Sequence, residues 1–306
     1  MNRPTDTSPV PHEPDTIAKS RIRWRPLLVI VALLGAGAAL FPWVQQSLNA
    51  TGSAPAPADD GRIHVPLFLD PAKVRPTPRF RFTFDRPQDL ADLRKQEKLD
   101  DVVAGAHDEL ERCIRLMRWT RRQWEPGVPN PYPPLDARII LRDIRSGFTK
   151  GFCAQYNYVL VQGLQSLGIY ARYVTLMGHE VIEARPRELN RWVCLDPLYD
   201  TLYTDDAGRL LSVYEVHRRL IQGRPVRITN DRLMGEVEQK LKAFSSFAVW
   251  LKNDHVGSPL NFADLERYKV HYLDSPDAGR LTPLGSLTTL EPADLYPDDT
   301  PSPAAD

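Results

Sequence analysis

The stretch Lys150-Gly151-Phe152-Cys153-Ala154-Gln155-Tyr156-Asn157-Tyr158 predicts the central helix of the fold and places a cysteine at its start. Apolar residues recur from there in steps of three and four as far as Leu167, and Gly168 is typical of a helix end. Cys153 therefore lies in the first turn, where unpaired backbone N–H groups and the positive end of the helix dipole favour a thiolate. The pattern indicates that Cys153 is a candidate nucleophile.

A histidine and an aspartate follow this helix at a workable distance. The next three segments are strand-like: Ile169–Leu176, His179–Arg185 and Arg191–Leu195. If residues 186–190 close an antiparallel hairpin with Arg185 opposite residue 190 or 191, His179 lies opposite residue 196 or 197. The hairpin thus brings His179 and Asp196 together. Cysteine, histidine and aspartate, the residue types of nucleophilic catalysis, come in that order from three adjacent elements.

Four short motifs in this region resemble a known family. They are Gly-x-Cys at 151–153, Leu-Gly-Ile-x-Ala-Arg at 167–172, His-x-x-x-Glu at 179–183 and Trp-Val-x-Leu-Asp-Pro at 192–197. In this order and spacing they are similar to the core of the transglutaminase-like superfamily of papain-type cysteine enzymes, over residues 105–220. Later residues resemble bacterial envelope proteins of this kind more than the animal cross-linking enzymes.

The resemblance implies an α+β fold in which a helix-borne cysteine packs on an antiparallel sheet. It implies Cys153 as nucleophile, His179 as general base and acid, and Asp196 as the group that orients the imidazole. One residue departs from the family pattern, because Val181 stands where members often carry an aromatic residue two positions after the histidine. The shape of the substrate cleft therefore stays open.

Each of these residues also has a structural interpretation. A cysteine in an apolar helix is often only packed, a strand histidine is often structural, and Asp196 before Pro197 could begin a turn. The run His179-Glu180-x-x-Glu183 could suggest a metal site, but it lacks the second histidine of a zinc-binding helix and follows a strand pattern. The flanking motifs favour catalysis, and neither a metal nor a cofactor is predicted.

The N-terminal region predicts a membrane anchor. Residues 1–25 are expected to form a disordered cytoplasmic tail, residues 26–46 a transmembrane helix, and residues 47–62 a linker rich in proline and alanine. Nineteen residues without a charge run from Pro26 to Val44, after several basic residues, which places the N-terminus in the cytoplasm. The plasma (inner) membrane would then hold this single-pass protein, with its catalytic domain periplasmic or extracellular. A cleaved signal peptide is the alternative.

The rest of the chain predicts one transglutaminase-like domain over residues 63–273 and a mostly disordered tail over residues 274–306. Within the domain we expect the following elements: a strand at Arg79–Phe84, one helix at Leu99–Trp124, a proline-rich loop at Pro126–Pro134, a short helix capped by Asp136, and helices at Val213–Gln222 and Leu233–Leu251. The last two would cover the sheet or form one wall of the cleft.

The composition of the chain narrows the range of possible functions. The 39 basic and 39 acidic residues balance, which disfavours nucleic acid as a partner, and no nucleotide-binding glycine motif occurs. The chain has three cysteines, which suits one free thiol with Cys113 and Cys194 either paired or simply buried.

These observations predict a membrane-anchored cysteine hydrolase, of peptidase or amidase type, that acts on a protein, a peptide or an envelope polymer. A protein-glutamine acyltransferase and a non-catalytic envelope-binding module of the same fold are the alternatives. The backbone N–H of Cys153 is one expected oxyanion donor, and Trp119, Trp124 and Asn130 are candidates for the second. The sequence fixes neither the substrate nor the oligomeric state.

Overall fold

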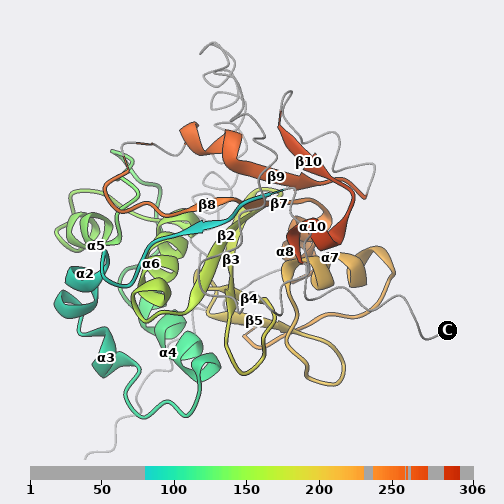
Figure 1. Cartoon of the computed structure of the whole chain (residues 1–306), viewed down its shortest axis with the longest axis horizontal. Helices are drawn as coiled ribbons and strands as arrows, with labels where there is room; N and C mark the ends of the chain where they lie inside the picture. Colours follow the sequence, from blue (N-terminus) through green and yellow to red (C-terminus); the bar gives the residue numbers. More distant parts are fainter. Residues whose placement is uncertain (1–79, 231–236, 259, 261–262, 275–285, 297–306) are drawn as a thin grey trace, which may run out of the picture. The chain divides into compact units, whose positions relative to one another are not determined.

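The computed structural model describes residues 80–230, 237–258, 260, 263–274 and 286–296, shown as coloured ribbon in Figure 1. The expected tail, membrane helix and linker of residues 1–62 lie outside the described residues. Within the described ranges, no helix is both long and apolar enough to cross a membrane. All described residues belong to one compact unit, residues 55–306.

The fold is mixed α+β, built on a largely antiparallel sheet of eight strands in the order β10-β9-β7-β2-β3-β4-β5-β6. Its strands are β2 (Tyr170–Leu176), β3 (His179–Arg185), β4 (Val193–Asp196), β5 (Thr201–Thr204), β6 (Arg227–Ile228), β7 (Phe247–Trp250), β9 (Lys269–Tyr272) and β10 (Leu287–Thr289). Strands β9 and β10 are parallel to each other. A separate parallel pair joins β1 (Thr83–Phe84) and β8 (Lys252–Asn253).

Helices lie on both faces of this sheet (Figure 1). The first group comprises α2 (Ala91–Gln96), α3 (Leu99–Val102), α4 (Glu109–Arg121), α5 (Ala137–Arg145) and α6 (Cys153–Ser166). The second comprises α7 (Val213–Ile221), α8 (Val237–Leu241) and α10 (Pro292–Leu295), with 3₁₀ segments η2 (Lys242–Ser245) and η3 (Ala263–Tyr268) elsewhere in the chain.

Alternation along β2 separates two apolar cores, one on each face. Ala171 and Tyr173 pack with α4, α5 and α6 in the first core, and Val174 and Leu176 pack in the second core with residues of α7 and β7. Helix α6 is buried along almost all its length, because helices surround it and β2 and β3 lie beneath it. A Cβ on Gly163 would come within 2.9 Å of Leu116, so glycine permits the close approach of α4 to α6.

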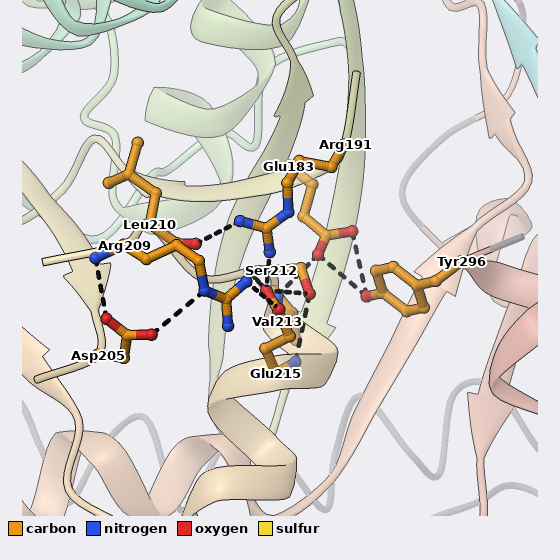
Figure 2. Close-up of polar contacts among 9 residues, drawn as sticks. All are labelled: Glu183, Arg191, Asp205, Arg209, Leu210, Ser212, Val213, Glu215 and Tyr296. Atoms are coloured by element: carbon orange, nitrogen blue, oxygen red, sulfur yellow. Dashed lines mark hydrogen bonds and ion pairs between the residues drawn. The ribbon is translucent and has the colours of Figure 1, made fainter. Parts of the chain in front are cut away.

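A buried ion pair organises the second face. Arg172 of β2 binds Glu183 of β3 at 2.7 Å, with side-chain exposures of 1% and 0%. Glu183 also accepts hydrogen bonds from the backbone N–H of Val213 at 2.7 Å and from the Tyr296 hydroxyl at 3.0 Å. Figure 2 shows Tyr296 and the start of α7 converging on this carboxylate. The pair therefore anchors both α7 and the segment after α10 to the sheet.

Two predicted helices differ from the structure. The expected helix at Leu233–Leu251 is wrong, because its described part consists of α8, the 3₁₀ segment η2 and then strand β7. Phe247 and Val249 face one core, whereas Trp250 faces the other, so this apolar run is a central strand buried on both faces. The expected helix at Leu99–Trp124 is divided into α3 and α4, since Gly105 takes a left-handed φ of 73° between them.

The ends of the domain also differ. The expected strand at Arg79–Phe84 is described from residue 80 onward, and within that part only Thr83–Phe84 pairs, with β8. Within the expected disordered tail, residues 286–296 form β10 and α10, and Leu295 and Tyr296 are fully buried. These two side chains supply the apolar contacts that hold the segment against the second core.

Other predicted features are confirmed. Helix α6 spans Cys153–Ser166 and is followed by Gly168 in the left-handed region, with φ of 79°. Asp136 caps α5 by accepting a hydrogen bond from the backbone N–H of Arg138 at 2.8 Å. Helix α7 begins one residue after Ser212, whose hydroxyl accepts from the backbone N–H of Glu215.

Candidate active site

Cys153 is the first residue of α6, and its side chain is partly exposed. The first backbone N–H groups of a helix have no acceptor within it, so they point toward any negative charge that forms there. The Gln155 side chain accepts the backbone N–H of Phe152 at 3.1 Å and fixes the entry into the helix. The cysteine thus stands at the positive end of a buried helix.

Glycine is needed at position 151, where the backbone that leads into α6 passes close to other side chains. A Cβ there would come within 2.6 Å of Ile144 Cδ1 and 2.9 Å of Trp124 Nε1. Its carbonyl accepts hydrogen bonds from the Trp124 indole at 3.2 Å and from the backbone N–H of Gly127 at 2.8 Å. The Gly-x-Cys spacing is therefore explained by packing, because only glycine fits beside Trp124 while holding the chain that leads into Cys153.

His179 begins β3 and Asp196 ends β4, and the structure brings their side chains together. His179 Nε2 lies 2.7 Å from Asp196 Oδ2, and Asp196 is fully buried. The carboxylate also accepts from the Tyr203 hydroxyl at 3.2 Å and from the backbone N–H groups of Leu198 and Tyr199 at 3.1 and 3.3 Å. Since the carboxylate can only accept, Nε2 carries the proton and Nδ1 is left for another partner.

The register that produces this contact is not the predicted one. Ala184 pairs with Val193 and Ile182 with Leu195, which sets Arg185 opposite residue 192 instead of 190 or 191. Extended by one pair, the ladder puts Asp196 opposite residue 181, on the same face as His179. With Arg185 opposite residue 191, Asp196 would have faced away from the histidine, because a one-residue slip exchanges the faces of a strand.

Cys153 interacts with the same imidazole. Burial alone would lower the pKa of His179, but the charge and hydrogen bond of Asp196, together with the hydrogen bond and charge of Cys153, raise this pKa well above its ordinary value. His179 is therefore held as an imidazolium between a carboxylate and a thiol. A cation beside a thiol favours its thiolate form.

Aromatic residues surround the imidazole and the thiol. The Tyr199 ring lies 5.4 Å from the His179 ring, and its hydroxyl accepts a hydrogen bond from Lys240 at 2.5 Å. Tyr132 approaches from the proline-rich loop, with its ring 6.4 Å from Phe152. Burial raises the pKa of Tyr132 well above its ordinary value, and the charges of Glu180 and Cys153 add to this effect. A hydrogen bond with the Gln155 side chain opposes it and joins the Tyr132 hydroxyl to the first turn of α6.

The second oxyanion donor stays a prediction. The Trp124 indole donates to Gly151, Trp119 packs against the first core, and Asn130 is exposed on the surface. Tyr132 is the site residue that sequence reasoning missed, although it is the aromatic residue of the loop at residues 126–134. The loop is tied to the segment before Cys153 because Asn130 N–H donates to the Thr149 hydroxyl, a contact that sequence spacing does not reveal.

The other two cysteines are free and fully buried, so the proposed pair of Cys113 and Cys194 is not formed. Cys113 lies in the first core and Cys194 in the second, on opposite faces of the sheet, which excludes a bond between them. In the described part of the chain, no three His, Cys, Asp or Glu residues are grouped to bind a metal ion.

Comparison with known proteins adds no relative. The chain matches no protein-family model, and no curated protein matches it.

Proposed function

We propose that the protein is a cysteine hydrolase of transglutaminase-like fold that cleaves amide bonds through Cys153, His179 and Asp196. The observation that carries the proposal is the 2.7 Å contact between His179 Nε2 and Asp196, on an imidazole that also interacts with Cys153. The order of elements, a helix opened by cysteine and then an antiparallel hairpin bearing histidine and aspartate, supports the transglutaminase-like fold.

The chemistry follows from these contacts. The Cys153 thiolate would attack the amide carbonyl, and the protonated His179 would donate its proton to the departing amine. Water, activated by the then neutral His179, would resolve the thioester. Asp196 keeps the Nε2 proton in place, and the Cys153 backbone N–H at the start of α6 would stabilise the oxyanion.

A polypeptide substrate is supported by the surface around the cysteine. Large apolar side chains are exposed on the segments that flank the site: Val128, Tyr132, Phe148, Phe152 and Met177. The loop that carries the first two is hydrogen-bonded to residues 149–151, immediately before Cys153. Exposed apolar residues that lie next to a reactive group favour a substrate with apolar side chains.

Hydrolysis is favoured over acyl transfer to an amine because the aromatic residues near Cys153 do not enclose it. Val181 is fully buried in the second core, so its size does not shape the cleft. Phe247 and Trp250 are likewise buried within the sheet layers and do not form a wall over Cys153. Of the aromatic residues near the thiol, Phe152 is 38% exposed, and Tyr132 leaves 41% of its side chain exposed although its hydroxyl is buried, so the edge of the site is open to water.

The test uses the full chain and a glutamine-containing peptide, offered with and without a labelled primary amine. We expect release of ammonia or of a peptide fragment, lost in Cys153→Ala and retained in the matched control Cys113→Ala. Amine incorporation that outpaces release would favour the acyltransferase. No turnover, together with no preferential alkylation of Cys153, would instead support the binding module.

We also propose that residues 26–46 anchor the protein in the plasma membrane with its catalytic domain outside the cytoplasm. The uncharged run from Pro26 to Val44, preceded by Lys19, Arg21, Arg23 and Arg25, supports this topology. A reporter enzyme fused after Asp306 should be active only outside the cytoplasm. Activity confined to the cytoplasm would contradict the proposed location.

A further inference from the structure

The Tyr173 hydroxyl lies between two acceptors beneath the candidate active site. Its oxygen is 2.8 Å from the carbonyl of Ala154, the residue after Cys153, and 2.9 Å from a carboxyl oxygen of Glu180, the residue after His179. A hydroxyl has one proton and can donate to only one of them. The carbonyl has no proton to offer. Both contacts are favourable together when the Glu180 carboxyl carries a proton and donates it to Tyr173.

The surroundings of Glu180 agree with a neutral carboxyl. Glu180 is 8% exposed and Tyr173 is 1% exposed. Burial raises the pKa of Glu180 above its ordinary value, against the opposing effects of the Lys269 ammonium, which is bound to Glu266 at 2.7 Å, of the Tyr173 hydrogen bond and of the His179 charge. The titratable and charged groups that face Glu180 from the elements around it are Tyr173 of β2, His179 of β3, Lys269 of β9, Glu266 of η3, Tyr158 of α6 and Tyr132 of the loop.

A second contact joins the same two elements. The Asn157 side-chain amide, on the next turn of α6, donates to the backbone carbonyl of Glu180 at 2.7 Å. Asn157 is fully buried. Helix α6, which carries Cys153, and strand β3, which begins with His179, are thus fastened to each other through both the backbone and the carboxyl of Glu180.

We propose that Glu180 is a positioning residue, a neutral carboxylic acid that acts through Tyr173 to hold the first turn of α6 at the right distance from His179. The inference rests on the proposed function. When Glu180 loses its proton, the Tyr173 hydroxyl turns to the carboxylate, because hydrogen bonds to a charged acceptor are the stronger ones. The Ala154 carbonyl then loses the hydrogen bond from Tyr173 that ties it to β2, and the turn that carries Cys153 loosens. Reactivity of Cys153 therefore declines as pH rises through the ionisation of Glu180.

The experiment measures the rate constant of Cys153 alkylation by iodoacetamide in the full chain, from about pH 6 to about pH 10. Glu180→Gln keeps the shape and can donate to Tyr173 but cannot ionise. Because both rate constants rise with ionisation of the thiol, the ratio of the wild-type to the Glu180→Gln rate constant removes that common pH dependence. We expect the ratio to be highest at the acid end and to fall several-fold toward the alkaline end. Tyr173→Phe should lower the rate constant several-fold over the whole range.

A matched control separates a general effect of removing a negative charge from the positioning role of Glu180. Glu238→Gln makes the same change at a carboxylate that is 90% exposed, and its ratio should stay flat. A flat ratio for Glu180→Gln, or a rate constant in that variant that has fallen at every pH, would overturn the positioning role. Wild-type Cys153 that reacts no faster than a free thiol would refute the proposed function instead. If Tyr173→Phe fails to fold, the Glu180→Gln ratio still decides.

Discussion

Replacement of Asp196 by asparagine should disable Cys153, and the hydrogen bonds around Asp196 explain why. One carboxyl oxygen accepts the backbone N–H groups of Leu198 and Tyr199, and the other accepts from His179 and Tyr203. In Asp196→Asn the carbonyl oxygen must take the first position, because the amide NH₂ cannot face two backbone donors. The NH₂ group is then directed at His179 Nε2.

This orientation reverses the tautomer of the histidine. Nε2 must accept from the new amide, so the ring proton moves to Nδ1, the nitrogen left for Cys153. The imidazole can then no longer accept a proton from the thiol. The variant also removes the carboxylate charge that raises the pKa of His179. The neutral ring thus presents a protonated Nδ1 to Cys153, and the positively charged ring is less favoured than in the wild type.

The loss of Cys153 reactivity in Asp196→Asn can be bounded from the charge interaction between Asp196 and His179. An opposite charge at this range shifts a pKa by roughly 1–3 units, and each unit corresponds to about 1.4 kcal/mol, or tenfold in population. Alkylation of Cys153 in Asp196→Asn, measured at about pH 6, should therefore be roughly 10- to 1000-fold slower than in the wild type.

The assay is peptide mapping after timed exposure of the full chain to iodoacetamide. Cys113 and Cys194 are fully buried and act as internal controls that react only if the variant unfolds. Tyr203→Phe, which removes a different hydrogen bond to the same oxygen, should change the rate much less. Wild-type reactivity with an unchanged pH profile in Asp196→Asn would refute the reasoning.

Three further predictions concern stability and are checked by urea unfolding followed by tryptophan fluorescence. Glu183→Gln leaves the buried Arg172 unpaired and should cost about 3–5 kcal/mol, whereas Asp89→Asn, which breaks an exposed pair with Arg86, should leave the urea midpoint unchanged. Gly151→Ala forces a Cβ against Ile144 and Trp124 and should cost about 1–3 kcal/mol, a prediction that fails if the midpoint is unaltered. Burial lowers the pKa of His255 to about 4 from its ordinary 6.5, so the folded state binds fewer protons than the unfolded state between these values. The contribution of His255 to stability should therefore fall as pH drops from 6.5 toward 4, and His255→Phe should remove this contribution from the curve.

The central part of the fold could be predicted because its signals are local. The run from Cys153 to Gly168 has helix periodicity with a glycine stop, and the three segments after it are strand-like and separated by turns. Histidine and aspartate were found because a hairpin brings them together over a short distance in sequence. The exact register was missed, since the turn extends one residue further, past Asn190 with its left-handed φ of 49°.

The features that could not be predicted depend on contacts between residues far apart in the sequence. The run Phe247–Trp250 has no alternation to mark it as a strand, because both of its faces are buried, and only its partners β2 and β9 determine its conformation. Tyr132 and Glu180 could not be selected, because their roles arise from contacts with α6 and β2 and from burial. The sequence pattern of a strand does not indicate whether an acidic residue in it will be buried in its neutral form.

The position of β7 between β2 and β9 has a consequence for synthesis on the ribosome. Strand β2 pairs early with β3, but its other edge waits for β7, which is roughly 70 residues later in the chain. At about 5–20 residues per second, that edge stays open for several seconds after β2 and β3 have emerged. Unpaired strand edges pair with strands of other chains, which leads to aggregation. The open edge of β2 carries the apolar side chains of Val174 and Leu176. The nascent polypeptide therefore passes through an interval in which a chaperone that covers this edge would improve its yield.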